Sequence, residues 1–172
     1  MHAPRFHGII AGAVFGLTFV LSSSWHQPLG EAATVARVSP SGDAIEIEHT
    51  AADGVVSRSS IPVHRAGEIR YFSAGVGLEE REAEYPPFPL KLIFVAGPRP
   101  YLSHVAVTIT DSNRTEVLRI PDDRVTGPWL FVELPAGRYE VTASRRDGRQ
   151  VTEHVQVPKT GTKVAHLRWP AP

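Results

Sequence analysis

Histidine is the residue type in this chain with the widest capacity for chemistry, because imidazole can bind a metal ion or transfer a proton near neutral pH. The sequence has eight histidines, and five of them lie beyond residue 26: His49, His64, His104, His154 and His166. None has the His-x-x-x-His or His-Glu-x-x-His spacing that places two ring nitrogens on one side of a helix. His154 and His166 could be neighbours on paired strands beside Glu140 or Glu153, but solvated histidines explain the same residues. The sequence therefore predicts no metal site and no cofactor.

Carboxylates are concentrated between residues 79 and 84, where four of six positions are glutamate. Such a run could bind a metal ion or supply paired acid and base catalysts, but the solvated face of a short helix explains it as well. The sequence has no Gly-x-Ser-x-Gly elbow, no glycine-rich phosphate loop that leads into a helix, and no cysteine. A Ser-His-Asp triad dispersed along the chain would be recognised only by geometry. We therefore predict that the chain is not an enzyme.

Arginines offer a candidate binding site. Arg145, Arg146 and Arg149 flank an Asp-Gly turn, and Arg138 stands at the start of the preceding strand. Guanidinium groups bind carboxylates and phosphates through paired hydrogen bonds. The alternative is that these charges keep an exposed hairpin from pairing with other strands.

Aromatic side chains are the second candidate for binding, because Tyr101, Trp129 and Trp169 could stack on sugars. The two tryptophans are in phase with apolar strand neighbours, and we expect them in the core. Tyr101 therefore joins the three arginines as a predicted binding residue.

The elements that position these residues are strands from residue 90 onward. Val105, Val107 and Ile109 alternate with polar or small residues, and Tyr139 and Val141 do the same. The expected strands are 90–95, 105–110, 116–120, 129–133, 138–145, 150–157 and 163–169. Turn residues separate them at short intervals, which is typical of a sandwich. The sequence predicts an all-β fold, a seven-stranded antiparallel β-sandwich of transthyretin-like or immunoglobulin-like type at residues 90–169. A two-residue turn at Asp147-Gly148 should supply the positive φ angles of a tight hairpin.

Residues 33–89 show weaker patterns and form a predicted N-terminal extension to the domain at residues 90–172. Residues 45–63 indicate a strand, an Asp53-Gly54 turn and a second strand, and residues 68–73 indicate a third strand. A helix of about two turns is expected near residues 77–84, and the prolines that follow Tyr85 prevent it from continuing. Whether residues 37–85 join the main sandwich is left open by the pattern.

The N-terminus is typical of an exported protein. Residues 8–21 are uncharged and apolar, after a short segment that carries Arg5. Fourteen residues cover only about 21 Å of the ~30 Å that a membrane-spanning helix must cross. We predict a signal peptide at residues 1–32 that is cleaved after Ala32, with nearby cleavage sites and an uncleaved anchor as alternatives. The expected location is the periplasm of a Gram-negative bacterium or the outside of the cell.

The composition restricts the classes of partner and of attachment that we expect for this chain. The formal net charge of the chain is zero, which gives no support for nucleic acid or an anionic membrane as a partner. The absence of cysteine excludes a disulfide framework and a lipid-attachment site.

Residues 134–141 read Leu-Pro-Ala-Gly-Arg-Tyr-Glu-Val. This segment resembles the Leu-Pro-x-Gly-x-Tyr-x-Val element of carboxypeptidase regulatory-like domains and other transthyretin-like sandwiches. The residues suit a corner between two strands, in which Leu134 and Pro135 end one strand and Gly137 turns the chain. Tyr139 then packs inward with its hydroxyl free to bond backbone. Residues 69–169 are also similar to small exported proteobacterial proteins of unassigned activity, and the resemblance implies a periplasmic sandwich.

The function that we expect is a non-catalytic module that binds a protein or a cell-envelope polymer through strand edges and loops. A carbohydrate-binding module is one alternative. A transthyretin-like hydrolase is another, but the enzymes of that group end in a Tyr-Arg-Gly-Ser element, and this chain ends in Trp-Pro-Ala-Pro.

Overall fold

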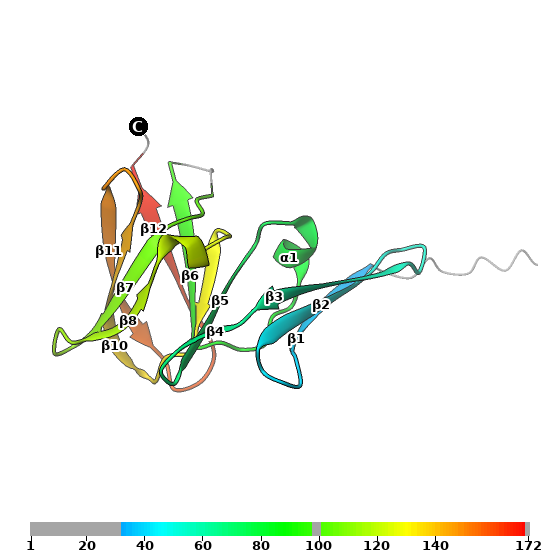
Figure 1. The fold of residues 1–172 in the computed structure, drawn as a ribbon, viewed down its shortest axis with the longest axis horizontal. Helices are drawn as coiled ribbons and strands as arrows, with labels where there is room; N and C mark the ends of the chain where they lie inside the picture. The colour runs from blue at the N-terminus through cyan, green and yellow to red at the C-terminus, as the bar shows by residue number, and fades with distance from the viewer. Residues whose placement is uncertain (1–31, 98–100, 171–172) are drawn as a thin grey trace, which may run out of the picture.

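The computed structural model describes residues 32–97 and 101–170, which form a layered β-structure with one short helix (Figure 1). The first strands are β1 (Ala33–Val38), β2 (Ala44–Thr50), β3 (Val56–Pro62), β4 (His64–Ala66) and β5 (Ile69–Ala74). After the helix α1 (Leu78–Glu82) come β6 (Leu90–Ala96), β7 (Ala106–Asp111), β8 (Glu116–Ile120) and the single turn of 3₁₀ helix η1 (Asp122–Arg124). The chain continues with β9 (Trp129–Val132), β10 (Gly137–Ser144), β11 (Gln150–Val157) and β12 (Lys163–Trp169).

Two sheets make the sandwich. A five-stranded sheet in the order β12-β6-β9-β5-β4 faces a four-stranded sheet in the order β11-β10-β7-β8. Val107, Ile109 and Val141 are fully buried between them, and Tyr139 is 9% exposed. The predicted alternation of buried and exposed side chains along β7 and β10 is therefore confirmed.

The strand count and one strand direction differ from the prediction. The two sheets hold nine strands within the described residues rather than seven, because β4 and β5 belong to the five-stranded sheet. β5 pairs with β9 and so joins the sandwich from the segment before residue 90. β12 runs parallel to β6, with Lys163 opposite Leu90 and Trp169 opposite Ala96. Alternation has the same period in parallel and antiparallel strands, so the sequence pattern did not reveal this direction.

A third layer is formed by β1, β2 and β3, which pair as an antiparallel sheet. We call this three-stranded sheet, residues 33–62, the arm. Figure 1 shows it projecting away from the sandwich at the side opposite β11. Its base packs on the outer face of the five-stranded sheet, where Ile45 and Ile47 meet Phe72 and Phe131 in a second core. The rings of Phe72 and Phe131 stack with centroids 4.6 Å apart.

Helix α1 is shorter than the predicted segment 77–84, and it has no buried residue. The carboxylate of Glu80 accepts hydrogen bonds from the backbone N–H groups of Gly75 (2.7 Å) and Val76 (3.0 Å), which satisfies donors just before the helix. No group of three or more metal-ligating side chains occurs in the part of the chain that the structure describes. Glu79, Glu80 and Glu82 therefore lie on a helix without buried residues, whereas Glu84 follows the helix and bonds through its backbone to β1.

The predicted signal peptide lies outside the described residues, apart from Ala32. β1 begins at the next residue, Ala33. Within residues 32–97 and 101–170, none of the helices has the length and the apolar composition needed to cross a membrane.

Candidate functional site

The corner between β9 and β10 positions one end of the candidate site. The hydroxyl of Tyr139 donates to the carbonyl of Pro135 at 3.0 Å. The Tyr139 ring packs on residue 137, where a Cβ would lie 3.4 Å from the ring, at ordinary van der Waals distance. Leu134 is buried in the main core. Burial raises the pKa of Tyr139, with the Asp111 carboxylate as a smaller cause in the same direction, and the hydroxyl stays protonated as a donor.

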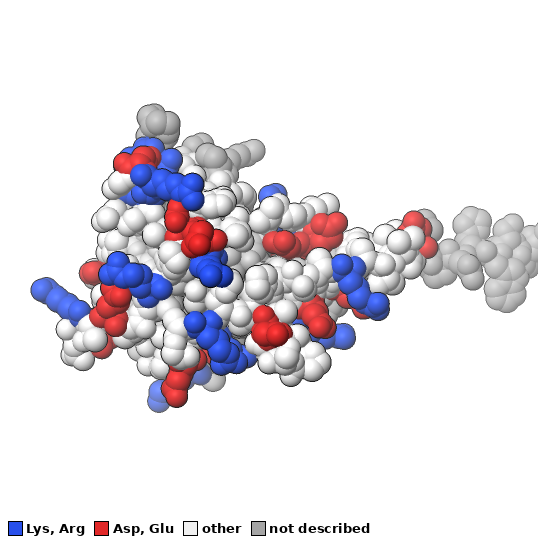
Figure 2. All heavy atoms as spheres, viewed as in Figure 1, with Lys and Arg blue, Asp and Glu red and all other residues white. Residues whose placement is uncertain are grey.

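The predicted arginine cluster at the β10–β11 hairpin is matched by carboxylates. Asp147 pairs with Arg149 at 2.9 Å and with Arg145 at 3.3 Å. Arg146 reaches Asp122 of η1 at 2.5 Å. The hydrogen bond from Arg149 is the largest cause of the lowered pKa of Asp147, which keeps that carboxylate ionised. An anion would have to compete with these internal partners, and Figure 2 shows positive and negative side chains interspersed over this face of the molecule.

The structure does not bring the other predicted residues to this hairpin. Arg138 lies at the opposite end of β10, opposite Gln156, and the strand length separates it from Arg145 by roughly 23 Å. Tyr101 is 53% exposed, and its ring lies 5.9 Å from the guanidinium of Arg81 in α1.

Trp129 and Trp169, the two candidate tryptophans, are largely covered by other residues. Trp169 is 1% exposed, as expected for a core residue. Trp129 is covered by the ammonium group of Lys91, which lies 3.5 Å from the ring centroid. Of the three aromatic candidates, Tyr101 is the most exposed, and Trp129 is half-buried rather than fully in the core.

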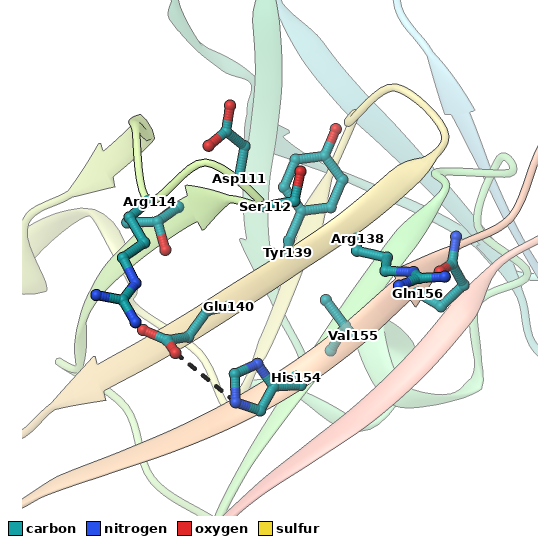
Figure 3. A pocket seen from close by; sticks show the side chains of 10 residues that line it. Asp111, Ser112, Arg114, Arg138, Tyr139, Glu140, His154, Val155 and Gln156 are labelled. Atoms are coloured by element: carbon teal, nitrogen blue, oxygen red, sulfur yellow. Dashed lines mark ion pairs between the residues drawn. The ribbon is translucent and has the colours of Figure 1, made fainter.

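A cavity of about 490 Å³ lies on the outer face of the four-stranded sheet, at the corner end of β10 (Figure 3). We call it the groove. Its lining includes two arginines and two carboxylates, and its polar residues are Thr110, Asp111, Ser112, Arg114, Arg138, Glu140, His154 and Gln156. Glu140 and His154 are cross-strand partners on β10 and β11, with Oε2 and Nε2 3.7 Å apart. In Figure 3, Arg114 points toward Glu140 from one side, and Arg138 extends beside Gln156 on the other. Positive groups therefore flank a central carboxylate and imidazole.

Arg114 reaches the groove from an unusual backbone conformation. The turn after β7 has the N–H of Asp111 bonded to the carbonyl of Thr115 (2.9 Å) and the N–H of Arg114 bonded to the carbonyl of Asp111 (3.0 Å). The β2–β3 and β10–β11 hairpins have the same pair of bonds, and glycine stands at the equivalent position in both: Gly54 at φ 83° and Gly148 at φ 82°. Arg114 has φ 63°. Side chains with a Cβ are strained in this left-handed region.

The same comparison corrects the predicted turn at Asp147-Gly148. Gly148 has a positive φ and Asp147 does not, so this is a type I turn followed by a left-handed glycine rather than a two-residue turn with two positive φ angles. Arg114 is a residue of the groove that was not among the predicted binding residues. Aligning residues 111–115 with 145–149 would have shown an arginine where the other turn has glycine.

Comparisons with known proteins leave the family open. No protein-family model matches the chain, and no curated protein matches it. Among solved structures, the chain is similar to BcpA*(D312A), the major pilin subunit of Bacillus cereus, at 11% identity with a TM-score of 0.33. The match covers 83% of this chain and 40% of the pilin chain, so this chain spans less than half the length of that protein. A likeness at this level carries no argument about function, and the chain is described by its own strands as an all-β sandwich.

Proposed function

We propose that this chain is a non-catalytic, exported binding module that holds an acidic cell-envelope polysaccharide in the groove. In this proposal residues 1–32 are a cleaved signal, the protein acts in the periplasm or outside the cell, and the sandwich is of the carboxypeptidase regulatory-like type. The observation that carries the proposal is Arg114, an arginine held at a left-handed position where the other two hairpins of this type have glycine. Backbone strain that persists in a fold is often associated with a functional site.

The chemistry of the groove suits an acidic polysaccharide. Arg114 and Arg138 stand on either side of Glu140 and His154, so two carboxylates of a polymer could each pair with a guanidinium. Glu140, His154 and Gln156 would lie between them as partners for sugar hydroxyls. The groove lies on an open sheet face, which lets a long polymer enter from the side.

The exposure of the groove supports binding rather than catalysis. The side chain of His154 is 82% exposed and that of Glu140 is 46% exposed. Acid–base catalysis depends on groups held in sites that exclude water and strengthen their electrostatic interactions. A solvated histidine–glutamate pair is better suited to reversible hydrogen bonding with a ligand. Turnover of hydroxyisourate by the purified protein would establish the hydrolase alternative instead.

The test is calorimetric titration of the purified protein with polygalacturonate, an acidic polysaccharide, and with dextran, a neutral one. We expect binding of the acidic polymer alone. Arg114→Gly, which suits the turn while removing the guanidinium, and Arg138→Gln should each weaken binding by tenfold or more, the usual loss for a charged hydrogen bond of about 1.5 kcal/mol.

The matched control is Arg37→Gln in the arm, which removes one positive charge on a different sheet. Binding should be unchanged by this substitution. Equal losses for all three variants would show unspecific attraction between net charges and contradict the groove. Absence of binding to polygalacturonate, with capture of a protein partner that survives Arg114→Gly, would also refute the proposal.

A further inference from the structure

The outer edge of the arm is an unpaired strand. β3 pairs only with β2 among the described residues, and Val56 to Ser60 are all exposed. The N–H of Val63 bonds to the carbonyl of Asp43, and residues along an antiparallel pair alternate between facing the partner and facing away. The backbone groups of Ser57, Ser59 and Ile61 therefore point toward β2. Those of Val56, Arg58 and Ser60 point away from it, as does the carbonyl of Pro62.

The position of Pro62 agrees with this alternation. Proline has no N–H, and at residue 62 the missing donor would have pointed toward the free edge. Pairing with β2 is therefore complete at this end, with Ala44 opposite Pro62. The open edge offers three N–H donors in register, from Val56, Arg58 and Ser60.

The other edges of the described sheets are protected. β1 is covered in part by Glu84, whose N–H and carbonyl bond to Thr34 and Ala36. β4 has three residues, and β8 carries an ion pair between Glu116 and Arg119 beside an irregular register with β7. β11 and β12 lie against each other where the two sheets meet. Natural sheets protect edges in these ways against unintended pairing. β3 also carries an ion-paired arginine, Arg58 with Glu48, and ends in Pro62, but it is seven residues long and has no strand on its outer side among the described residues.

The geometry points to a second copy of this chain as the partner: β3 pairs antiparallel with β3 of the other copy about a two-fold axis at Ser59. In this register Arg58 lies opposite Ser60 of the second copy, and Val56 lies opposite Pro62. Each outward N–H meets an outward carbonyl, and the two arms form one continuous sheet. A two-fold axis at Arg58 would place two arginines opposite each other, which is unfavourable.

Charges on the exposed face of the arm fit the same register. Within one arm, Arg58 pairs with Glu48 at 2.9 Å, and Arg37 lies opposite Glu46, which lies opposite Ser60. Pairing at Ser59 extends this cross-strand row into the second copy, where Arg58 lies next to Ser60 and is followed by Glu48. Positive and negative side chains therefore alternate across the dimer. Ser60 is small and leaves the neighbouring arginine room to reach Glu46. The backbone donors and acceptors of β3 and the charges on the arm are therefore complementary to those of a second copy.

Cysteine cross-linking tests the register, because the chain has no cysteine of its own. In the proposed dimer, residue 59 faces its own copy in a pair without mutual hydrogen bonds, where Cα atoms lie about 4.5 Å apart. This separation is within the range of a disulfide, about 4.4–6.8 Å. We expect Ser59→Cys to form a covalent dimer with oxidised glutathione. The control Ser57→Cys would have its two sulfurs about 14 Å apart along the strand and should stay uncross-linked.

Light scattering of the unmodified protein tests the association itself, and we expect the mass of two chains. Ser60→Lys places a cation opposite Arg58 of the second copy and should shift the protein to monomer while a far-ultraviolet circular dichroism spectrum stays unchanged. A monomer at every protein concentration up to the solubility limit would overturn the proposal. Equal cross-linking of Ser57→Cys and Ser59→Cys would overturn the register, and a dimer unaffected by Ser60→Lys would show that another surface is used.

Discussion

Replacing Arg114 with glycine should make the protein more stable, although it removes a long side chain from the surface. An L-residue in the left-handed region costs roughly 1–2 kcal/mol. Removing this strain should stabilise the protein, but glycine loses more backbone entropy on folding, which offsets about 0.5–1 kcal/mol of the stabilisation. Arg114 is exposed, and among the described residues no ion pair involves it, so little packing is lost. The net gain in the free energy of unfolding should be about 0.5–1 kcal/mol.

The assay is thermal and urea unfolding of the two proteins side by side. For a chain of this length, 1 kcal/mol corresponds to a change in Tm of about 2–4 °C, so Arg114→Gly should raise the Tm by about 1–4 °C. The midpoint in urea should rise with an unchanged m value, because the surface exposed on unfolding is nearly the same.

A reciprocal variant separates backbone strain from other effects. Gly148→Arg places arginine at the equivalent position of the β10–β11 turn, where a Cβ would meet no heavy atom within 4 Å. Space is therefore not limiting, and any loss of stability reports the cost of the positive φ. We expect a net loss of about 0.5–1 kcal/mol, because removing glycine also removes the extra backbone entropy that it loses on folding, and this offsets part of the strain. If Arg114→Gly failed to raise the Tm while Gly148→Arg lowered it, the conclusion that Arg114 is strained would be wrong.

Three further predictions concern the sandwich. Tyr139→Phe should lower the free energy of unfolding by about 1 kcal/mol, since it removes only the hydrogen bond to Pro135, whereas Tyr139→Ala should cost about 3–5 kcal/mol; urea unfolding measures both. Gly127→Ala should leave little folded protein in a solubility and circular dichroism assay, because the added Cβ would overlap the carbonyl oxygen of Ala74. Acid should weaken the protein through Glu133, whose pKa is lowered chiefly by the hydrogen bond from Arg70: the stabilisation is present above the usual pKa of 4.5 and is lost as the pH falls through the lower folded value. Urea titrations between pH 5 and pH 2, as an approximate range around these values, should show a smaller dependence for Glu133→Gln.

The strands from residue 90 to residue 169 could be located from the sequence because their burial alternates with a period of two. β11 and β12, for example, were predicted with the bounds that the structure gives them. Alternation reports which face a side chain occupies but not which strand lies beside it, so the parallel pairing of β12 and the place of β5 were not predictable. β1 was missed because its residues directly follow the expected cleavage site and read as the start of an irregular extension.

The candidate site was less accessible to sequence reasoning for a related reason. The arginines of the β10–β11 hairpin are close in sequence and could be grouped, but the carboxylate of Asp122 that neutralises Arg146 comes from 24 residues earlier. The groove combines side chains of β10 and β11 with a turn that follows β7. An alignment of the turn sequences shows the arginine in place of glycine, but the positive φ of Arg114 and the two bonds that close the turn are properties of the structure.

The adjacent inner strands β5 and β9 are buried on both faces. Tyr71, Leu130 and Val132 belong to the main core, while Phe72 and Phe131 belong to the second core. If the arm detached, the outer face of β5 and β9 would be exposed to solvent, while their inner face forms part of the sandwich core. Cooperative opening of both layers should therefore be required before the amides of β5 and β9 exchange with deuterium, and these amides should be the last to exchange. The arm is therefore part of the folding unit. A protein truncated to start after residue 62 should unfold with lower cooperativity rather than fold as a smaller sandwich.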